Sequence, residues 1–130
     1  MTGLAYVDAS AIVKLVLHEP DSPSMVRWYV ESERVATSVL GIIETNRAVA
    51  RREHDGSHLR SVLATLVTLE LDDPVARLAS MVRPASLRTH DAIHLATALS
   101  LGTELDAFVT YDDRLAAAAR DVGLPVVRPA

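Results

Sequence analysis

Short apolar runs alternate along the chain with longer segments in which apolar residues recur every three or four positions. The runs predict strands at residues 4–8, 35–38, 69–72 and 107–111, and an edge strand at residues 125–128. The longer segments predict helices at residues 10–17, 38–54, 57–66, 74–82, 89–101 and 112–123, with a further helix around residues 26–30. Strands that alternate with helices indicate a parallel sheet with crossover helices.

Several residue types mark where these helices begin, end and pack. Ser38 and Thr89 are predicted N-caps, and Pro74 is a proline of the N1 type. Gly102 and Gly123 are predicted to end helices. Two helices have a predicted buried face, formed in one by Val26, Trp28, Tyr29 and Val30 and in the other by Val39, Leu40, Ile42, Ile43, Val49 and Ala50.

Composition narrows the possible classes of protein. With 130 residues and 49% hydrophobic residues, the chain is expected to fold as one domain. The net charge of −4 disfavours a general nucleic-acid coat protein, and the absence of cysteine excludes thiolate zinc sites and disulfides. The first ten residues have no basic region and carry Asp8 where a signal peptide needs an apolar run, and no later apolar stretch is long enough to span a bilayer. We therefore expect a cytoplasmic protein with no membrane partner.

Four acidic residues occupy positions that are typical of a metal site. Asp8 ends the first predicted strand, Asp112 follows the fourth, Asp91 falls in the first turn of a helix, and Glu44 lies between Ile43 and Thr45 at a partly buried position. In open α/β sheets, ligands bind at the carboxyl ends of the strands, near the switch in strand order.

Each of these acids alone has an ordinary structural interpretation. Asp91 and Asp112 can act as helix caps, Asp8 can be part of a turn, and Glu44 can pair with Arg47. Together, however, converging carboxylates repel one another unless a cation neutralises them. Ligation by oxygen alone suits Mg²⁺ or Mn²⁺, which assist phosphoryl chemistry.

The segment "LRTHDAIHLATAL", residues 87–99, places His90 and His94 one helical turn apart with Asp91 between them. This spacing is similar to that of a zinc-protease helix, but such a helix carries Glu where Asp91 stands and also needs a third ligand. We therefore disfavour a zinc site on this helix.

Four segments, in order, resemble the PIN-domain ribonucleases and, within them, the VapC toxins of type II toxin–antitoxin pairs: "YVDASAIVKL", "IIETNRA", "RTHDAIHLATAL" and "FVTYDDRL". The resemblance covers nearly the whole chain, so the PIN domain would span residues 1–130. It implies an α/β/α sandwich with a five-stranded parallel sheet. It also implies an endoribonuclease that depends on Mg²⁺ or Mn²⁺, cleaves RNA with a metal-activated water and leaves 5′-phosphate and 3′-hydroxyl ends. A small VapB-type antitoxin would inhibit it, and we expect a homodimer and a toxin–antitoxin hetero-oligomer.

Residue by residue, the resemblance assigns the metal-binding and catalytic quartet to Asp8, Glu44, Asp91 and Asp112, with Ser10 and Thr110 as polar neighbours. It thus implies that Asp91 is the functional residue of its helix and that the two histidines are bystanders, although His94 can still line the site. The spacing T-x-D-x-x-L favours Asp112 as the fourth ligand, but Asp113 could substitute or hold a water. Five basic residues flank these segments and could meet RNA phosphates: Lys14, Arg47, Arg51, Arg52 and Arg114.

Other functions on a similar sheet fit the sequence less well. A dehalogenase-like phosphatase needs a second Asp where this chain has Ser10, and a receiver domain needs paired acids and a late Lys that do not appear. The turn "DASAIV" lacks the glycine-rich loop of a dinucleotide-binding domain. A PIN-like binding module without catalysis stays open as an alternative.

Overall fold

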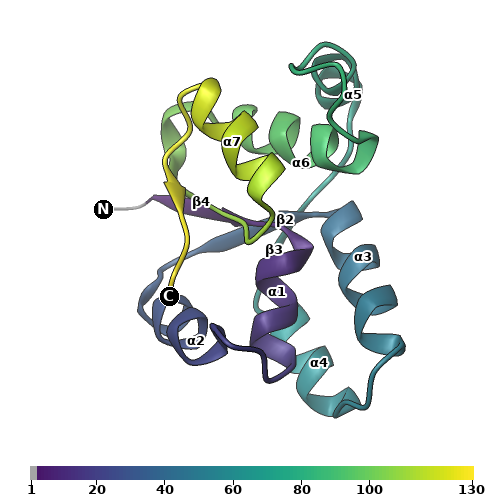
Figure 1. The fold of residues 1–130 in the computed structure, drawn as a ribbon, viewed down its shortest axis with the longest axis vertical. Coiled ribbons are helices and arrows are strands. Elements are labelled where there is room, and N and C mark those ends of the chain that lie inside the picture. The colour runs from purple at the N-terminus through teal and green to yellow at the C-terminus, as the bar shows by residue number, and fades with distance from the viewer. Residues whose placement is uncertain (1–2) are drawn as a thin grey trace.

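The structure, a computed structural model, describes residues 3–130 and is built around one parallel sheet (Figure 1). The strands lie in the order β3-β2-β1-β4-β5, and every neighbouring pair is parallel. Strand order therefore reverses between β1 and β4, which is where such sheets bind ligands. The strands are β1 (Leu4–Val7), β2 (Val35–Ser38), β3 (Val67–Leu69), β4 (Leu105–Val109) and β5 (Val126–Val127).

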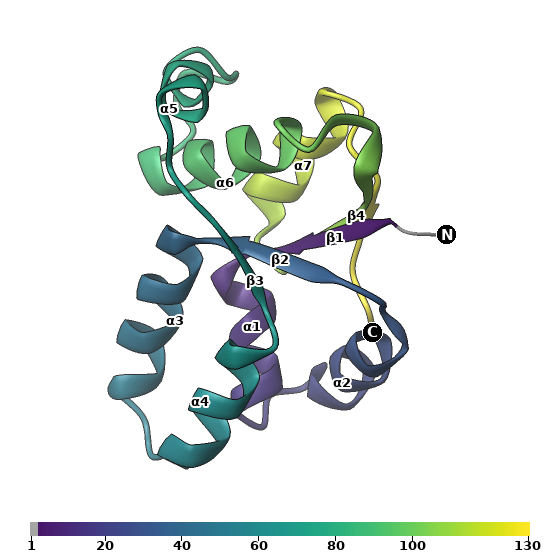
Figure 2. The ribbon, with the colours of Figure 1, turned by 180° about the vertical axis from the view of Figure 1, so that it is seen from behind.

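Helices cover both faces of the sheet and give the three layers expected from the sequence. Figures 1 and 2 show α1 to α4 on one face and α5 to α7 on the other. The first group is α1 (Ala9–Val16), α2 (Ser22–Glu31), α3 (Val39–Ala50) and α4 (Gly56–Ala64). The second group is α5 (Asp73–Ala79), α6 (Thr89–Leu99) and α7 (Asp113–Asp121), with a short 3-10 helix, η1 (Gly102–Glu104), before β4.

Alternation along the strands divides the core between these two faces. Ala5 and Val7 of β1 join one buried cluster with Ile12 of α1 and Met25 of α2. Tyr6 points to the opposite face and packs in a second cluster with Leu95, Phe108 and Leu115, among others. Because successive side chains of a strand point to opposite faces, both sides of β1 are apolar, as expected for a strand that is covered on both faces.

The predicted strand at residues 69–72 is misplaced, because β3 covers Val67–Leu69 and so begins two residues earlier and ends three residues earlier. This strand lies at the edge of the sheet, and Val67 and Thr68 are exposed. Because the strand is only partly buried, its apolar pattern is weak and does not define its bounds. At the other edge, β5 lies close to its predicted position.

Two predicted buried faces need correction. On α2, Val26 and Val30 are exposed, and Met25 is the buried anchor instead. Trp28 and Tyr29 are half-buried and pack against the core, as predicted.

On α3, Val39, Ile43 and Ala50 are exposed and Leu40 and Ile42 are half-buried, so that only Val49 of the predicted face is fully buried. Gly41 and Thr45 are buried beside it. Apolar residues lie nearly all around this helix, so their pattern did not say which side faces the core.

The predicted helix ends are mostly correct. Ser38 caps α3 by accepting a hydrogen bond from Gly41 N, and Gly123 follows α7 with a φ of 83°. Gly102, with a φ of 58°, follows the end of α6. Thr89 is not an N-cap, because Arg88 holds that position without a side-chain bond, and Asp73 rather than Pro74 begins α5. Among residues 3–130, no helix is both long enough and apolar enough to cross a bilayer.

Candidate active site

Asp8 lies at the centre of the candidate site, directly after β1, and its carboxylate is 4% exposed. It caps α1 by accepting a hydrogen bond from Ala11 N at 3.1 Å. Ser10 Oγ donates to Oδ1 at 2.6 Å, and Thr110 Oγ1 donates to Oδ2 at 2.5 Å. Burial raises the pKa of Asp8, although these hydrogen bonds favour the charged form and act against the increase.

The hydroxyl groups of Ser10 and Thr110 join the ends of β1 and β4. Ser10 Oγ accepts a bond from Tyr111 N at 2.8 Å, and Thr110 Oγ1 accepts one from Asp112 N at 3.0 Å. Each hydroxyl therefore accepts a hydrogen bond from the backbone after β4 and donates one to the carboxylate after β1. This arrangement holds Asp8 rigidly at the switch in strand order.

Asp91 and Asp112 lie near a shared cation, Arg88. Asp91 is 4% exposed, and its Oδ2 makes no hydrogen bond and lies 3.5 Å from Arg88 Nε. Asp112 caps α7 through Leu115 N at 2.9 Å, and its Oδ2 lies 3.4 Å from Arg88 Nη2. Both ion-pair distances exceed the 2.7–2.9 Å of a strong charge-assisted bond, and the Arg88 side chain is 56% exposed. Arg88 can therefore swing away from the two acids.

The hydrogen-bond partner of Glu44 is His94 of α6, not Arg47 of its own helix. Its Oε1 lies 2.6 Å from His94 Nε2, and its side chain is 26% exposed. The other ring nitrogen of His94, Nδ1, lies 2.7 Å from the hydroxyl of Tyr6. His94 is thus engaged at both nitrogens, which corrects its interpretation as a bystander. His90, by contrast, is partly exposed, with Nε2 at 3.5 Å from Asp91 Oδ1.

The four predicted acids come from four elements, but their oxygens do not yet converge. Within residues 3–130, no group of three or more His, Asp or Glu side chains is positioned to hold a metal ion. The chemistry of the donors nevertheless fits a hard divalent cation, because all four are carboxylates and the buried Oδ2 of Asp91 has no hydrogen-bond partner. A metal site would require side-chain movements that bring these oxygens together, with Arg88 displaced from Asp91 and Asp112.

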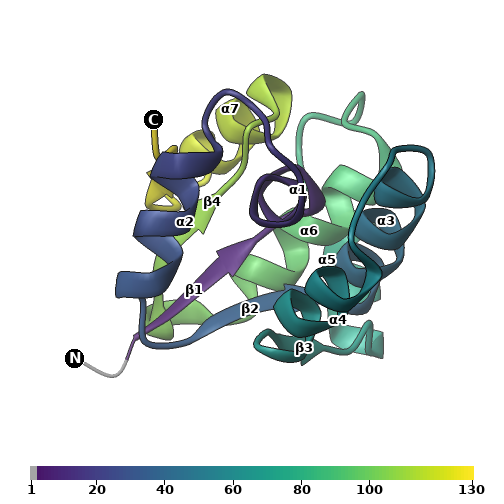
Figure 3. The same ribbon diagram turned by 90° about the horizontal axis from the view of Figure 1, so that it is seen from below.

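Basic side chains lie in two hollows, each of which also contains one of the acids. A hollow of about 760 Å³ is lined by Glu44 together with Lys14, Arg47 and Arg51. A second hollow, of about 460 Å³, is lined by Asp91 together with Arg88 and Arg114. Figure 3 shows the end of β1 leading into α1, beside α3 and α6, which carry Glu44 and Asp91.

Two predicted residues are directed elsewhere. The side chain of Asp113 is 89% exposed and forms an ion pair with Arg128 at 2.9 Å. Arg52 pairs with Glu19 at 2.9 Å, and Lys14 also lies 3.3 Å from Glu19. The geometry therefore places Asp112, rather than Asp113, beside Asp91.

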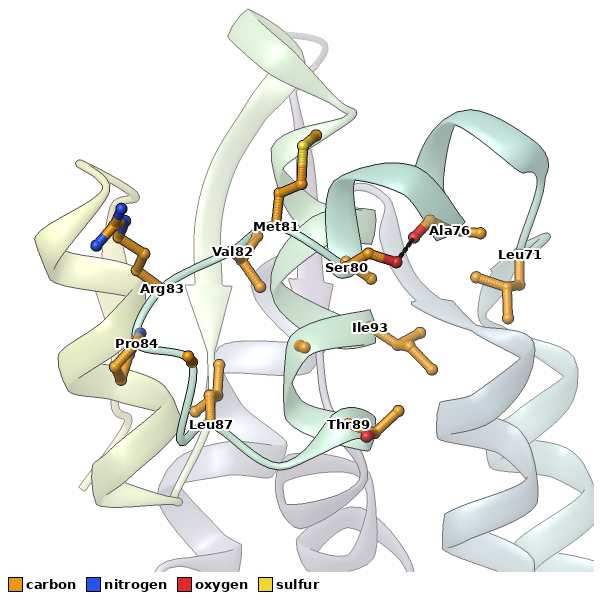
Figure 4. Close-up of a pocket in the computed structure, with 13 residues that line it drawn as sticks. Leu71, Ala76, Ser80, Met81, Val82, Arg83, Pro84, Leu87, Thr89 and Ile93 are labelled. Carbon is orange, nitrogen blue, oxygen red and sulfur yellow. Dashed lines mark hydrogen bonds between the residues drawn. The ribbon is translucent and has the colours of Figure 1, made fainter.

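A further hollow, of about 600 Å³, lies between α5, α6 and the loop at residues 81–87 (Figure 4). Its lining is mostly apolar and includes Leu71, Met81 and Ile93. Among the described residues that line it, Arg83 alone is charged. It offers no carboxylate and is not suited to bind a metal ion.

Sequence reasoning missed three residues around the acids: Arg88, Tyr6 and the role of His94. Arg88 precedes Asp91 by three positions, a helical spacing that could have indicated the ion pair. Tyr6 looked like one more apolar strand residue, and its bond to His94 spans 88 positions of sequence. No local pattern signals a contact of that kind.

Comparison with known proteins places this arrangement in a family. Residues 5–121 match the PIN domain. Ribonuclease VapC47 of Mycobacterium tuberculosis (strain CDC 1551 / Oshkosh) is 42% identical, over 97% of each chain. Two solved structures share the fold. VapC20 of Mycobacterium tuberculosis, described as a Sarcin-Ricin loop cleaving toxin, has a TM-score of 0.75 at 19% identity and covers 96% of this chain and 99% of its own. A toxin–antitoxin complex from Klebsiella pneumoniae has a TM-score of 0.71 at 21% identity and covers 97% of this chain and 98% of its own. The chain therefore belongs to the PIN domain family and, within that family, to the VapC group.

Proposed function

We propose that this protein is an endoribonuclease that depends on Mg²⁺ or Mn²⁺ and acts as the toxin of a VapBC-type pair. The observation that carries the proposal is the placement of two buried acidic residues, Asp8 directly after β1 at the switch in strand order and Asp91 on α6, each of them 4% exposed. Buried carboxylates destabilise the folded chain unless a cation compensates for their charge, and the Oδ2 atom of Asp91 also lacks a hydrogen-bond partner. A metal-binding role explains why they are there.

Asp8, Glu44, Asp91 and Asp112 are the residues that would hold the metal. When bound, a divalent cation would neutralise their charge, polarise a phosphate and lower the pKa of water at the site. The hydroxyl bonds from Ser10 and Thr110 favour the ionised form of Asp8 and orient its carboxylate. Because these bonds do not depend on the metal, the centre of the site is organised before any ligand binds.

The two hollows beside the acids support a nucleic-acid substrate. Lys14, Arg47 and Arg51 line the hollow that contains Glu44, and Arg88 and Arg114 line the one that contains Asp91, so that RNA bound in either would lie beside a carboxylate. These contacts would be made to phosphates, and such contacts fix position without reading sequence. A local basic lining is also what an acidic chain, with a net charge of −4, needs in order to bind RNA.

The proposal is tested by cleavage of a fluorescent RNA in Mn²⁺, in Mg²⁺ and after addition of EDTA. Activity should disappear in EDTA, and Asp91→Asn should reduce it at least about 100-fold, more than the loss expected from changing a neighbour of a ligand. Asp106→Asn is a matched control, because Asp106 is exposed and precedes the core of β4 at the opposite end of the strand. Full activity in the chelator would exclude metal dependence, and a folded but inactive wild type would favour a binding module.

A protein partner is the second part of the proposal. Val39 and Ile43 are 40% and 49% exposed on α3, the helix that also carries Glu44. An antitoxin segment could cover this apolar surface and bring a basic side chain to the carboxylates.

Co-expression with the neighbouring upstream reading frame tests the partner. Toxicity should be suppressed, and a complex should co-purify. Persistent toxicity without a complex would contradict the toxin–antitoxin assignment while leaving the nuclease assignment intact. The expected homodimer stays a prediction, which light scattering of the purified chain can test.

A further inference from the structure

Three side chains from three elements form a continuous hydrogen-bonded chain that ends at a predicted metal ligand. The hydroxyl of Tyr6 on β1 lies 2.7 Å from His94 Nδ1, and His94 Nε2 on α6 lies 2.6 Å from Glu44 Oε1 on α3. Tyr6 is fully buried and His94 is 1% exposed. Buried polar groups of this kind are costly unless each is paired, so their pairing needs a physical account.

The protons in this chain can be assigned from its chemistry. The hydroxyl of Tyr6 is a phenol, which carries its proton at neutral pH because the ordinary pKa of a phenol is about 10, so it can donate to Nδ1. The proton of a neutral His94 is then on Nε2, where it donates to the Glu44 carboxylate. The opposite tautomer would set the Nε2 lone pair against a carboxylate oxygen at 2.6 Å, which is repulsive.

Packing fixes the orientation of this chain. The ring of Tyr6 stacks on Phe108, with centroids 5.6 Å apart and planes at 2°, and meets the His94 ring edge-on at 5.8 Å. Gly41 of α3 lies against this imidazole, because a Cβ at that position would be in van der Waals contact with His94 Cε1 at 3.4 Å, while it would clash with Thr37 Oγ1 at 2.1 Å. The imidazole therefore has little freedom to turn, and Nε2 is aimed at Glu44.

We propose that His94 is a positioning residue, which Tyr6 holds in its Nε2–H tautomer so that it orients the Glu44 carboxylate for metal binding. This inference rests on the proposed function and deepens it. In this proposal α6 contributes to the site in two ways. Asp91 supplies one carboxylate, and His94, three residues later on the same helix, orients the carboxylate of Glu44. Outer partners that orient a metal ligand are worth about 10- to 100-fold in metal affinity or activity.

Two amide variants separate positioning from simple packing. The amide nitrogen of Gln can reach the place of Nε2 and donate to Glu44, whereas the shorter Asn reaches only the place of Nδ1, beside Tyr6. Both replace a buried ring by a buried amide, so their costs in stability should be similar. If His94 acts only in packing, His94→Gln and His94→Asn should behave alike.

The experiment measures Mn²⁺ binding by calorimetry and RNA cleavage for both variants, with thermal melts to verify folding. His94→Asn should weaken Mn²⁺ binding about 10- to 100-fold, with a similar loss of cleavage, while His94→Gln should recover most of both. Equal losses in the two variants would overturn the proposal. A wild type that binds no Mn²⁺ and cleaves no RNA would instead refute the proposed function.

Nuclear magnetic resonance tests the proton assignment in the metal-free protein, without any activity. Long-range ¹H–¹⁵N correlations of the wild type should show His94 with a protonated Nε2 and a bare Nδ1, the signals being assigned by their loss in His94→Gln. Tyr6→Phe, which keeps the stacked ring, should shift the Nδ1 signal. A protonated Nδ1 in the wild type, or signals that Tyr6→Phe leaves unchanged, would overturn the chain of bonds even if the amide variants fail to fold.

Discussion

Replacing Asp8 by Asn is predicted to stabilise the metal-free protein while removing its activity. Asn is close to Asp in size, and its single oxygen can keep the two bonds to Oδ1, from Ser10 Oγ and Ala11 N. Its amide nitrogen would face Thr110 Oγ1, which can rotate and accept instead of donating. The helix cap and the local network therefore survive, and the charge is the main property that is lost.

The magnitude follows from two opposing effects. Hydrogen bonds to a charged group are worth about 1 kcal/mol more than neutral ones, which over three bonds favours Asp by roughly 3 kcal/mol. Burying the charge costs several kcal/mol. The raised pKa of Asp8 shows that burial is the larger effect. The N-terminus of α1 also favours the charge by up to about 1 kcal/mol, so we expect the Asp8→Asn variant to gain only about 1 kcal/mol.

The assay is thermal and urea denaturation in EDTA, for the wild type, Asp8→Asn and Asp8→Ala. For a chain of this length, a gain of 1 kcal/mol corresponds to an increase in Tm of about 4 °C. Asp8→Ala is the contrasting variant, because it removes the N-cap of α1, worth about 1 kcal/mol, and leaves the hydroxyls of Ser10 and Thr110 without their acceptor.

The difference between the wild type and Asp8→Asn should depend on pH in a defined direction. Because the pKa of Asp8 is raised in the folded state, the folded protein takes up this proton at a higher pH than the unfolded chain does. The free energy of unfolding therefore falls as pH rises from the unfolded-state pKa through the folded-state pKa. The advantage of Asp8→Asn should therefore be greatest at neutral pH and shrink as the solution is acidified. Excess Mn²⁺ should reverse the order, because metal binding stabilises the wild type alone.

A loss of stability in Asp8→Asn at neutral pH in EDTA would refute this reasoning. That result would mean that the charge-assisted bonds outweigh burial and that Asp8 is a structural cap. An advantage that grew on acidification would contradict the direction of the pKa shift.

The remaining predictions concern the fourth ligand and the substrate. Asp112→Asn, which keeps an N-cap, should lose about 100-fold or more in RNA cleavage. Asp113→Asn should stay within about threefold of the wild type, because Asp113 is exposed and forms an ion pair with Arg128. Equal losses would show that both residues bind the metal. The double change of Arg47 and Arg51 to Ala should raise KM and lower the salt dependence of RNA binding by roughly 0.7 for each lost phosphate contact, and a change of the exposed Arg27 on α2 should leave both unchanged. A salt slope that does not move would exclude Arg47 and Arg51 from the RNA path.

The sequence by itself determined the architecture, because the architecture depends on local patterns. Apolar runs that alternate with segments of helical period predict a parallel sheet covered on both faces, and every observed strand pair is parallel. The chain position of Asp8 directly after β1 follows from the same pattern, as does the capping role of Asp112. Where apolar residues surround a helix, as on α3, or a strand lies at the edge, as with β3, the pattern was ambiguous, and the buried face and the strand bounds were misplaced.

Only the tertiary structure decided which side chains hold the acids in place. Glu44 is separated by 50 positions from His94, and His94 by 88 from Tyr6, so that no periodicity relates them. The spacing of His90 and His94 along the helix did not indicate that His94 contacts Glu44 and Tyr6. A helical repeat shows which residues share a face, but not which residues of other elements that face contacts. Arg88 meets Asp112 because α6 and α7 cover the same face of the sheet. These contacts depend on how whole elements pack, and packing is a property of the folded core rather than of any short segment.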